Sequence, residues 1–134
     1  MGNEVRSKKK IKNFRDLDAW KVAHKMVLQV YRATRGFPQE ELYGLVSQMR
    51  RAAVSIVSNI AEGFSRTSSK EKQQFYAIAL GSIVELQSQL EIAKDLGYLD
   101  DANCHQLMNL SVDAHKLVNG LIKGARDRIM GNEA

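Results

Sequence analysis

Residues 47–66, SQMRRAAVSIVSNIAEGFSR, carry two stripes that run side by side along one helix. At 100° per residue, the apolar and small side chains of this segment fall on one face, which predicts an amphipathic helix. The second stripe is polar, with members three or four residues apart: Gln48, Arg51, Ser55, Asn59 and Glu62. Short hydroxyls and amides at the edge of a core indicate that another element packs closely there, with hydrogen bonds across the contact. That element is a helix of the same bundle, a second subunit or a nucleic acid, and the pattern leaves all three open.

Three further segments predict helices around this one. The first starts near Asp16, a good N-cap, and ends at Gly36, in the C′ position, before the only proline, Pro38. Residues 39–41 place acidic side chains where a helix dipole favours them, so we expect this turn to lead straight into the helix of residues 47–66. Within that region Gly44 is a weak point, and Gly63 marks either close packing or the end of the helix.

The longest predicted helix covers about residues 70–95, with Ser68 or Ser69 as its cap and Gly97 at its end. The last helix begins at Asp100 or Asp101 and continues to about residue 125. Some apolar side chains on both helices point away from the main apolar stripe, which indicates a second buried face and therefore another subunit. These side chains are Ala77, Val84 and Ile92 on the longer helix and Met108 and Val112 on the last one.

Composition and pattern together predict one all-α domain. The chain has 134 residues, 44% of them hydrophobic, and no run shows β alternation. Four helices with short connections predict an antiparallel up-down-up-down four-helix bundle over residues 14–127, between a basic disordered tail (1–13) and a frayed C-terminus (128–134). The single cysteine allows no intrachain disulfide, and no apolar run is long enough for a membrane span. We expect a cytoplasmic protein.

Positive charge is concentrated at the N-terminus. The net charge is +5, and residues 1–12 hold five basic side chains against one acidic one. The tail lysines Lys8, Lys9, Lys10 and Lys12 fit contacts with phosphate, and equally a solubilising end without a partner. Arg50, Arg66, Lys70 and Lys72 are the other candidate nucleic-acid contacts, although Arg66 and both lysines also fit an ordinary solvated turn. No aromatic residues are interleaved with these cations, so binding would read backbone and shape.

Signatures of catalysis are missing from the sequence. It contains no Glu-x-x-His pair, no His-Glu-x-x-His, no phosphate-binding glycine loop and no Cys-x-x-Cys, so we expect no enzyme, metal or cofactor. His24 is predicted to be a core-edge histidine with one satisfied nitrogen, and Cys104 a semi-buried thiol. Glu85 lies off the core stripe of its helix, and we predict an interhelix or intersubunit bond from Arg51 to Glu85.

Several separated motifs resemble one bacterial family. They are Phe14, Leu17 and Trp20; FPxxExYGL over residues 37–45; QxRRAAxSI and NIAEG over 48–63; GSxxEL over 81–86; and LGYL over 96–99. They resemble the four-helix bundle family named for open reading frames in intervening sequences of 23S ribosomal RNA genes, over about residues 14–125. The last predicted helix matches the family least distinctively, and the basic tail lies outside the family pattern.

The resemblance implies a bundle that assembles as a ring-like homopentamer. It also implies a distant relation to the accessory proteins of diversity-generating retroelements, which bind a reverse transcriptase and nucleic acid. It implies no known reaction and carries over no catalytic residue. The prediction is therefore a non-enzymatic oligomeric bundle that binds structured RNA or another nucleic acid. The alternative is a scaffold or accessory protein whose partner is another protein, such as a reverse transcriptase.

Overall fold

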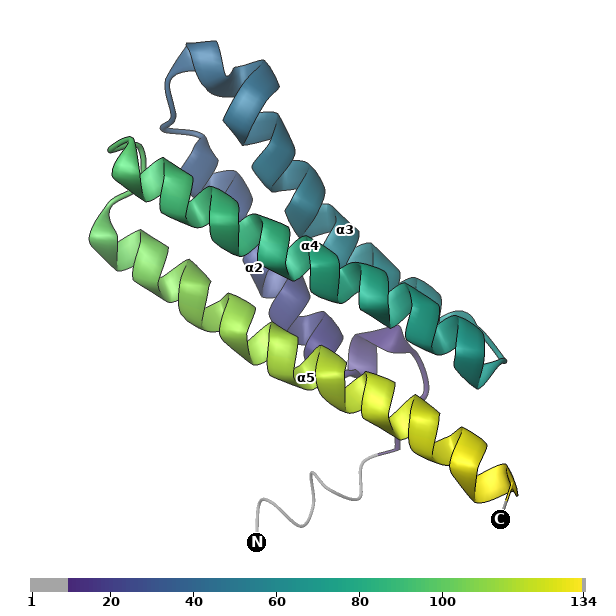
Figure 1. The fold of residues 1–134 in the computed structure, drawn as a ribbon. Coiled ribbons are helices and arrows are strands. Elements are labelled where there is room, and N and C mark those ends of the chain that lie inside the picture. Colours follow the sequence, from purple (N-terminus) through teal and green to yellow (C-terminus); the bar gives the residue numbers. More distant parts are fainter. Residues whose placement is uncertain (1–9, 134) are drawn as a thin grey trace, which may run out of the picture.

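The computed structural model describes residues 10–133, with side chains up to residue 128. Four α-helices make up the described chain: α2 (Asp18–Thr34), α3 (Ser47–Ser65), α4 (Ser69–Asp95) and α5 (Asp101–Glu133). Successive helices run in opposite directions (Figure 1). Each helix packs against two others, since α2 and α4 each contact both α3 and α5. No strand occurs in this part of the chain. The predicted all-α, up-down four-helix arrangement is confirmed.

The predicted N-terminal tail and the predicted frayed C-terminus lie partly outside the residues that the structure describes. Residues 1–9 lie outside the described part of the chain, so the disorder expected for the tail and the environments of Lys8 and Lys9 stay predictions. Lys10 and Lys12 are exposed. At the other end α5 continues to Glu133, beyond the domain limit expected at 127. The structure describes side chains only up to residue 128, so the fraying expected over residues 128–134 also stays a prediction.

The first helix begins differently from expectation. A short 3-10 helix, η1 (Phe14–Asp16), precedes α2, and Asp16 belongs to this turn rather than capping α2. Its carboxylate accepts hydrogen bonds from the backbone N–H of Lys12 at 2.9 Å and of Asn13 at 3.2 Å. These bonds close a capping box with the Asn13 side chain. The predicted N-cap is therefore displaced, because the carboxylate is used by the donors that precede it.

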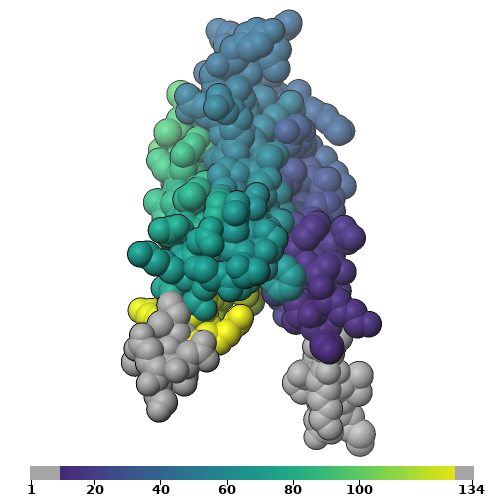
Figure 2. Space-filling model, turned by 90° about the vertical axis from the view of Figure 1, so that its right-hand side faces the viewer, coloured from purple at the N-terminus to yellow at the C-terminus, as the bar shows by residue number. Residues whose placement is uncertain are grey.

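The connection between α2 and α3 also departs from the prediction. Gly36 does not take the left-handed C′ conformation, since Gly97 is the one described glycine with a positive φ. A 3-10 turn, η2 (Gln39–Glu41), and a π-helical turn, η3 (Leu42–Val46), follow Pro38, so residues 39–41 do not run straight into α3. Gly44 has φ −112° and ψ −109°, which interrupts the helix at the predicted weak point. This connection stands above the rest of the molecule in Figure 2.

The ends of α4 agree with the sequence. The Ser68 hydroxyl accepts a hydrogen bond from the Glu71 N–H at 3.1 Å, which confirms the N-cap. Gly97, with φ +79°, closes the helix in a Schellman motif, since its N–H donates to the Lys94 carbonyl and the next N–H donates to the Ala93 carbonyl, both at 2.9 Å. Asp100 caps α5 by accepting the N–H of Asn103 at 2.7 Å.

The core is made of side chains from all four helices, most of them aliphatic. Gly63 is buried against Tyr76 of α4. Of the two roles predicted for this glycine, close packing is therefore the one that the structure supports. Val84, Ile92 and Val112 are exposed in the single chain, as the second apolar face predicted. Among the described helices, none combines the length and the apolar character needed to span a bilayer.

Candidate nucleic-acid interface

The middle of the polar stripe on α3 is satisfied inside the bundle. The hydroxyl groups of Ser55 and Ser82 share a hydrogen bond of 2.8 Å between α3 and α4. Asn59 donates from Nδ2 to the carbonyl oxygen of Ser55 at 2.8 Å and to its hydroxyl at 3.2 Å. Of the three interpretations of the stripe, contact with a neighbouring helix of the same bundle accounts for Ser55, whereas Asn59 is satisfied within α3 itself. Gln48, Arg51 and Glu62 remain exposed.

The predicted bond between Arg51 and Glu85 does not form within one chain. Glu85 accepts a hydrogen bond from Nε2 of Gln89 at 3.1 Å. The Arg51 guanidinium makes no hydrogen bond or ion pair with any other residue that the structure describes. The interhelix version of the prediction is wrong, because each side chain turns outward on its own helix. The intersubunit version stays a prediction.

Two of the three predicted cations at the α3–α4 turn are used internally. Arg66 pairs with Glu62 at 3.0 Å and with Glu71 at 3.9 Å, and its guanidinium lies 4.6 Å from the centre of the Phe75 ring. The charge of Arg66 is therefore compensated by two carboxylates. The sequence led us to expect Glu71 as the one acidic residue near these cations. Glu62 was missed, because that ion pair forms only when the last turn of α3 brings the Glu62 and Arg66 side chains together.

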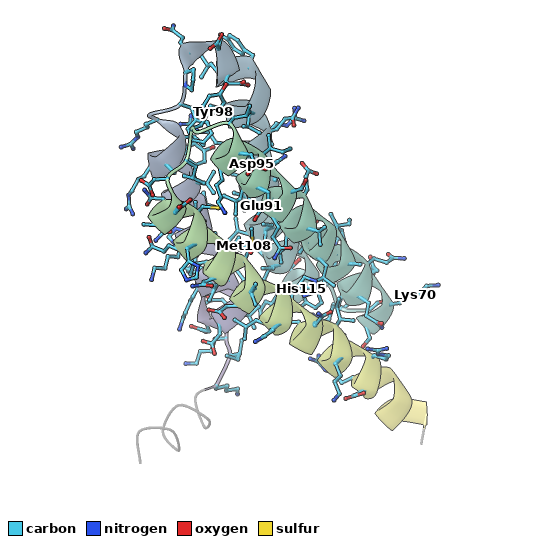
Figure 3. The ribbon with its side chains drawn as sticks, turned by 60° about the vertical axis from the view of Figure 1, so that its left-hand side comes forward. Lys70, Glu91, Asp95, Tyr98, Met108 and His115 are labelled. Atoms are coloured by element: carbon cyan, nitrogen blue, oxygen red, sulfur yellow. The ribbon has the colours of Figure 1, made fainter. Side chains whose placement is uncertain are left out.

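Lys72 completes the end of α3. Its Nζ donates to the carbonyl oxygens of Phe64 at 2.7 Å and Gly63 at 3.3 Å in the last turn of the helix, and the Gly63 carbonyl also accepts the N–H of Arg66 at 3.3 Å. Desolvation by burial, and secondarily the charge of Arg128, lower the pKa of Lys72. Lys70 is exposed, makes no polar contact within the described chain and projects away from the start of α4 (Figure 3). Lys70 alone of these three cations is free for a ligand.

Arg50 holds α3 against α2. Its Nε donates to the hydroxyl of Thr34 at 2.9 Å and its Nη2 to the carbonyl oxygen of Tyr31 at 3.4 Å. The guanidinium also lies 4.5 Å from the centre of the Tyr31 ring, a cation–π arrangement. Thr34 is buried and donates its own hydroxyl to Val30 at 2.7 Å. Arg50 was predicted to be exposed or at an interface; it is half-buried, and no short-range pattern links it to a threonine 16 residues earlier.

A groove lies on the outer side of α3 beneath the projecting η3 turn. Its volume is about 630 Å³. A second groove of about 390 Å³ adjoins it, shares Leu42, Val46 and Arg50 with it, and adds Arg35. We call the two together the arginine groove, after the cations and aromatic rings that line it: Arg35, Arg50, Arg51, Tyr31 and Tyr43.

The charged side chains that line the arginine groove are all basic. No acidic side chain lines either of its parts. Arg35 and Arg51 are exposed and make no side-chain hydrogen bond or ion pair with the described residues, whereas Arg50 is bound to uncharged oxygens only. The sequence led us to expect no aromatic side chains among the cations, and this expectation is wrong. Tyr31 and Tyr43 reach the arginines from α2 and η3, and only the fold brings them there.

Neither His24 nor Cys104 forms a reactive site with the residues described. His24 is exposed and stacks on Trp20, with ring centres 4.8 Å apart, so the predicted core-edge position is wrong. Cys104 is buried rather than semi-buried as predicted, and desolvation raises its pKa. The neighbouring His105 is exposed. Within the described residues no cluster of three metal-binding side chains occurs.

Comparison with known proteins identifies the family. A sequence model of the 23S rRNA-intervening sequence protein family matches residues 15–120. The chain belongs to this family. A crystal structure of a protein of unknown function from the S23 ribosomal protein family of Bacteroides thetaiotaomicron is similar, with 21% identity and a TM-score of 0.72, over 78% of this chain and 95% of that one. At this identity the similarity shows the fold alone. No curated protein matches the sequence.

Proposed function

We propose that this member of the 23S rRNA-intervening sequence protein family is a non-enzymatic, homo-oligomeric bundle that binds structured RNA. The observation that carries the proposal is the arginine groove, where three arginines gather without an acidic side chain. Cations of this kind bind phosphate by releasing condensed counterions. Arg51 is the central contact, because it is exposed and its charge has no counterion within the described chain.

Other free cations lie away from the arginine groove. Lys70 is free at the far end of α3, and Lys10 and Lys12 are exposed near the start of α2, whereas the groove lies at the end of α2 and the start of α3. Each of these side chains offers a phosphate contact separate from the groove. Arg66 and Lys72 add little, because their charged groups already have partners in the fold.

Assembly of several chains would repeat this surface. The outer side of α4 leaves Ile78, Val84, Ile92 and Leu96 about half exposed, more apolar surface than one helix of a monomer usually presents to water. Burying these side chains in a neighbouring subunit removes that cost. The number of five subunits rests on the family resemblance. Sedimentation equilibrium tests it, and a monomer at micromolar concentration would refute the oligomer.

The test of RNA binding is a titration of a structured RNA at several salt concentrations. It uses the full chain, a version lacking residues 1–13, and Arg51→Gln. We expect binding to survive the truncation, and Arg51→Gln to lower the slope of log affinity against log salt by about 0.7–0.9, the loss of one phosphate contact. Arg126→Gln is the matched control, since Arg126 is exposed on α5 outside the groove. Loss of all binding with the tail would place the RNA site there and refute the groove.

A protein partner, such as a reverse transcriptase, is the alternative. The apolar part of the groove lining, made of Leu42, Val46 and Val54, favours it, because an amphipathic helix could bury its apolar face there. In that case the purified chain would bind the protein in a fixed ratio, and nuclease treatment would leave the complex intact. Failure of the full chain to bind RNA at low salt would favour this alternative over RNA binding.

A further inference from the structure

Tyr43 is the most exposed large hydrophobic side chain of the described residues, with 93% of its surface accessible. It lies in η3, where the turn is interrupted at Gly44 and the Glu41 carboxylate accepts the N–H of Leu45 at 3.3 Å. The backbone is therefore fixed while the ring stands free. An aromatic ring held in water by an ordered turn gains free energy when another flat or apolar surface covers it.

The surroundings of Tyr43 restrict what that surface can be. Tyr43 is one of the residues that line the arginine groove, which also contains the partly exposed Tyr31 and the unpaired guanidinium of Arg51. A ligand that complements this arrangement has a flat π-face next to a negative charge. A nucleotide has both, since its base stacks on an aromatic ring and its phosphate pairs with arginine. The larger part of the groove, about 630 Å³, lies in the range of small-ligand sites.

We propose that the arginine groove binds an unpaired nucleotide of RNA, with its base stacked on Tyr43 and an adjacent phosphate on Arg51. This inference rests on the proposed RNA-binding function and adds the class of RNA. Inside a duplex both faces of each base are already stacked, so a base can reach Tyr43 only from a loop, a bulge or a single strand. The site therefore selects structured RNA that carries unpaired residues.

Charge distribution favours RNA over a protein helix in this groove. A helix that docks through apolar side chains would need few charges in the groove, yet Arg51 presents a cation without any carboxylate nearby in the lining. Such a cation adds affinity for every anionic segment, and a phosphate backbone supplies one charge per nucleotide. A second copy of the chain or a partner protein is the competing occupant, and the experiment distinguishes both from RNA.

The experiment compares two fluorescein-labelled RNAs, a single-stranded oligouridine and a blunt duplex of equal charge, by anisotropy with the full chain. Tyr43→Ala should weaken binding of the single strand by about 5- to 150-fold, the range for one lost base stack, and leave duplex binding within a factor of about two. Tyr43→Phe is the matched control and should bind like the unchanged protein, because stacking needs the ring and not the hydroxyl. Arg51→Gln should weaken both RNAs.

Each other outcome has a distinct meaning. Equal loss for both RNAs with Tyr43→Ala, or no loss for either, overturns base stacking while the proposed RNA binding stands. Failure of the unchanged protein to bind either RNA at low salt overturns the proposed function itself. A change of oligomer mass in Tyr43→Ala, measured by sedimentation, shows that a second copy occupies the groove and overturns this inference. Since the ring of Tyr43 is almost fully exposed, the variant should fold, and far-ultraviolet circular dichroism checks this.

Discussion

Replacing Gly63 by alanine tests a close contact between α3 and α4. An added Cβ would lie 2.6 Å from Cε1 and 2.8 Å from Cδ1 of Tyr76. Unstrained carbon atoms lie about 3.5–4.0 Å apart, so the ring would have to move by about 1 Å. Tyr76 is only 3% exposed and packed on the core, so it has little room to move. Overpacking of this kind costs about 1–3 kcal/mol, while alanine gains about 1 kcal/mol of helix propensity. Because the required shift is large, we expect a net loss of about 1–2 kcal/mol.

Gly120→Ala supplies the matched control. Gly120 lies inside α5, is exposed, and has no atom within 4 Å of its added Cβ. The same substitution there should stabilise the protein by about 0.5–1 kcal/mol. The free energy of unfolding is measured by urea titration followed by circular dichroism, at one chain concentration because an oligomer makes stability depend on concentration.

A double-mutant cycle isolates the contact itself. In a Tyr76→Leu background the ring is gone, so Gly63→Ala should no longer destabilise the protein and should approach the gain seen at Gly120. The reasoning is refuted if Gly63→Ala stabilises the unaltered protein as much as Gly120→Ala does. It is also refuted if the loss at Gly63 is the same with and without the Tyr76 ring.

Three further predictions concern polar side chains in the core or at its edge. Thr34→Val keeps the side-chain shape but removes the acceptor for Arg50, so urea titration should show a free energy of unfolding lower by about 1–2 kcal/mol. An unchanged free energy of unfolding would contradict a stabilising hydrogen bond between Arg50 and Thr34. Burial raises the pKa of the Cys104 thiol and hides it, so a disulfide reagent should react far more slowly with the folded protein than in urea, and equal rates would contradict its burial. Desolvation, followed by the hydrogen bond donated to Glu41, raises the pKa of Tyr98. Because this pKa is raised in the folded state, Tyr98 contributes stability that is fully present below the unfolded pKa of about 10 and is lost as the pH rises further. The Tyr98→Phe variant has no such contribution to lose, so its stability should fall less in alkali than that of the unchanged protein. Identical pH profiles would refute this contribution of Tyr98.

The helices and most of their ends could be predicted because their signals are local. The apolar stripe on α3, the Ser68 cap and the Gly97 terminus each depend on residues within a few turns of one another. The exposed apolar side chains on α4 followed from the same periodicity, since they lie away from its core face. The predicted N-cap, Asp16, lies one residue before the N-cap of α2, Leu17, because two turns compete for one carboxylate and the sequence does not say which of them it caps.

The η3 turn and its consequences could not be predicted in the same way. A π-helical turn needs one more residue than an α-helical turn, and no residue type specifies it. That turn decides where Tyr43 points, and the packing of α2 on α3 decides that Tyr31 faces the same groove. Both rings belong to the candidate site only through these two tertiary facts, so the aromatic part of the site was missed.

Arg50 and Arg51 show why a count of charges in sequence misjudges a binding surface. Neighbours on a helix point about 100° apart, so one of the two arginines turns toward α2 and is bound there by Thr34, while the other faces water. The turn after α3 gives the same contrast, since Arg66 is paired with carboxylates and Lys70 is not. The charge that a ligand can use is therefore the charge that the fold leaves without a partner. By that criterion the proposed surface for phosphate lies on the outer side of α3, whereas Arg50, Arg66 and Lys72 mainly hold the helices together.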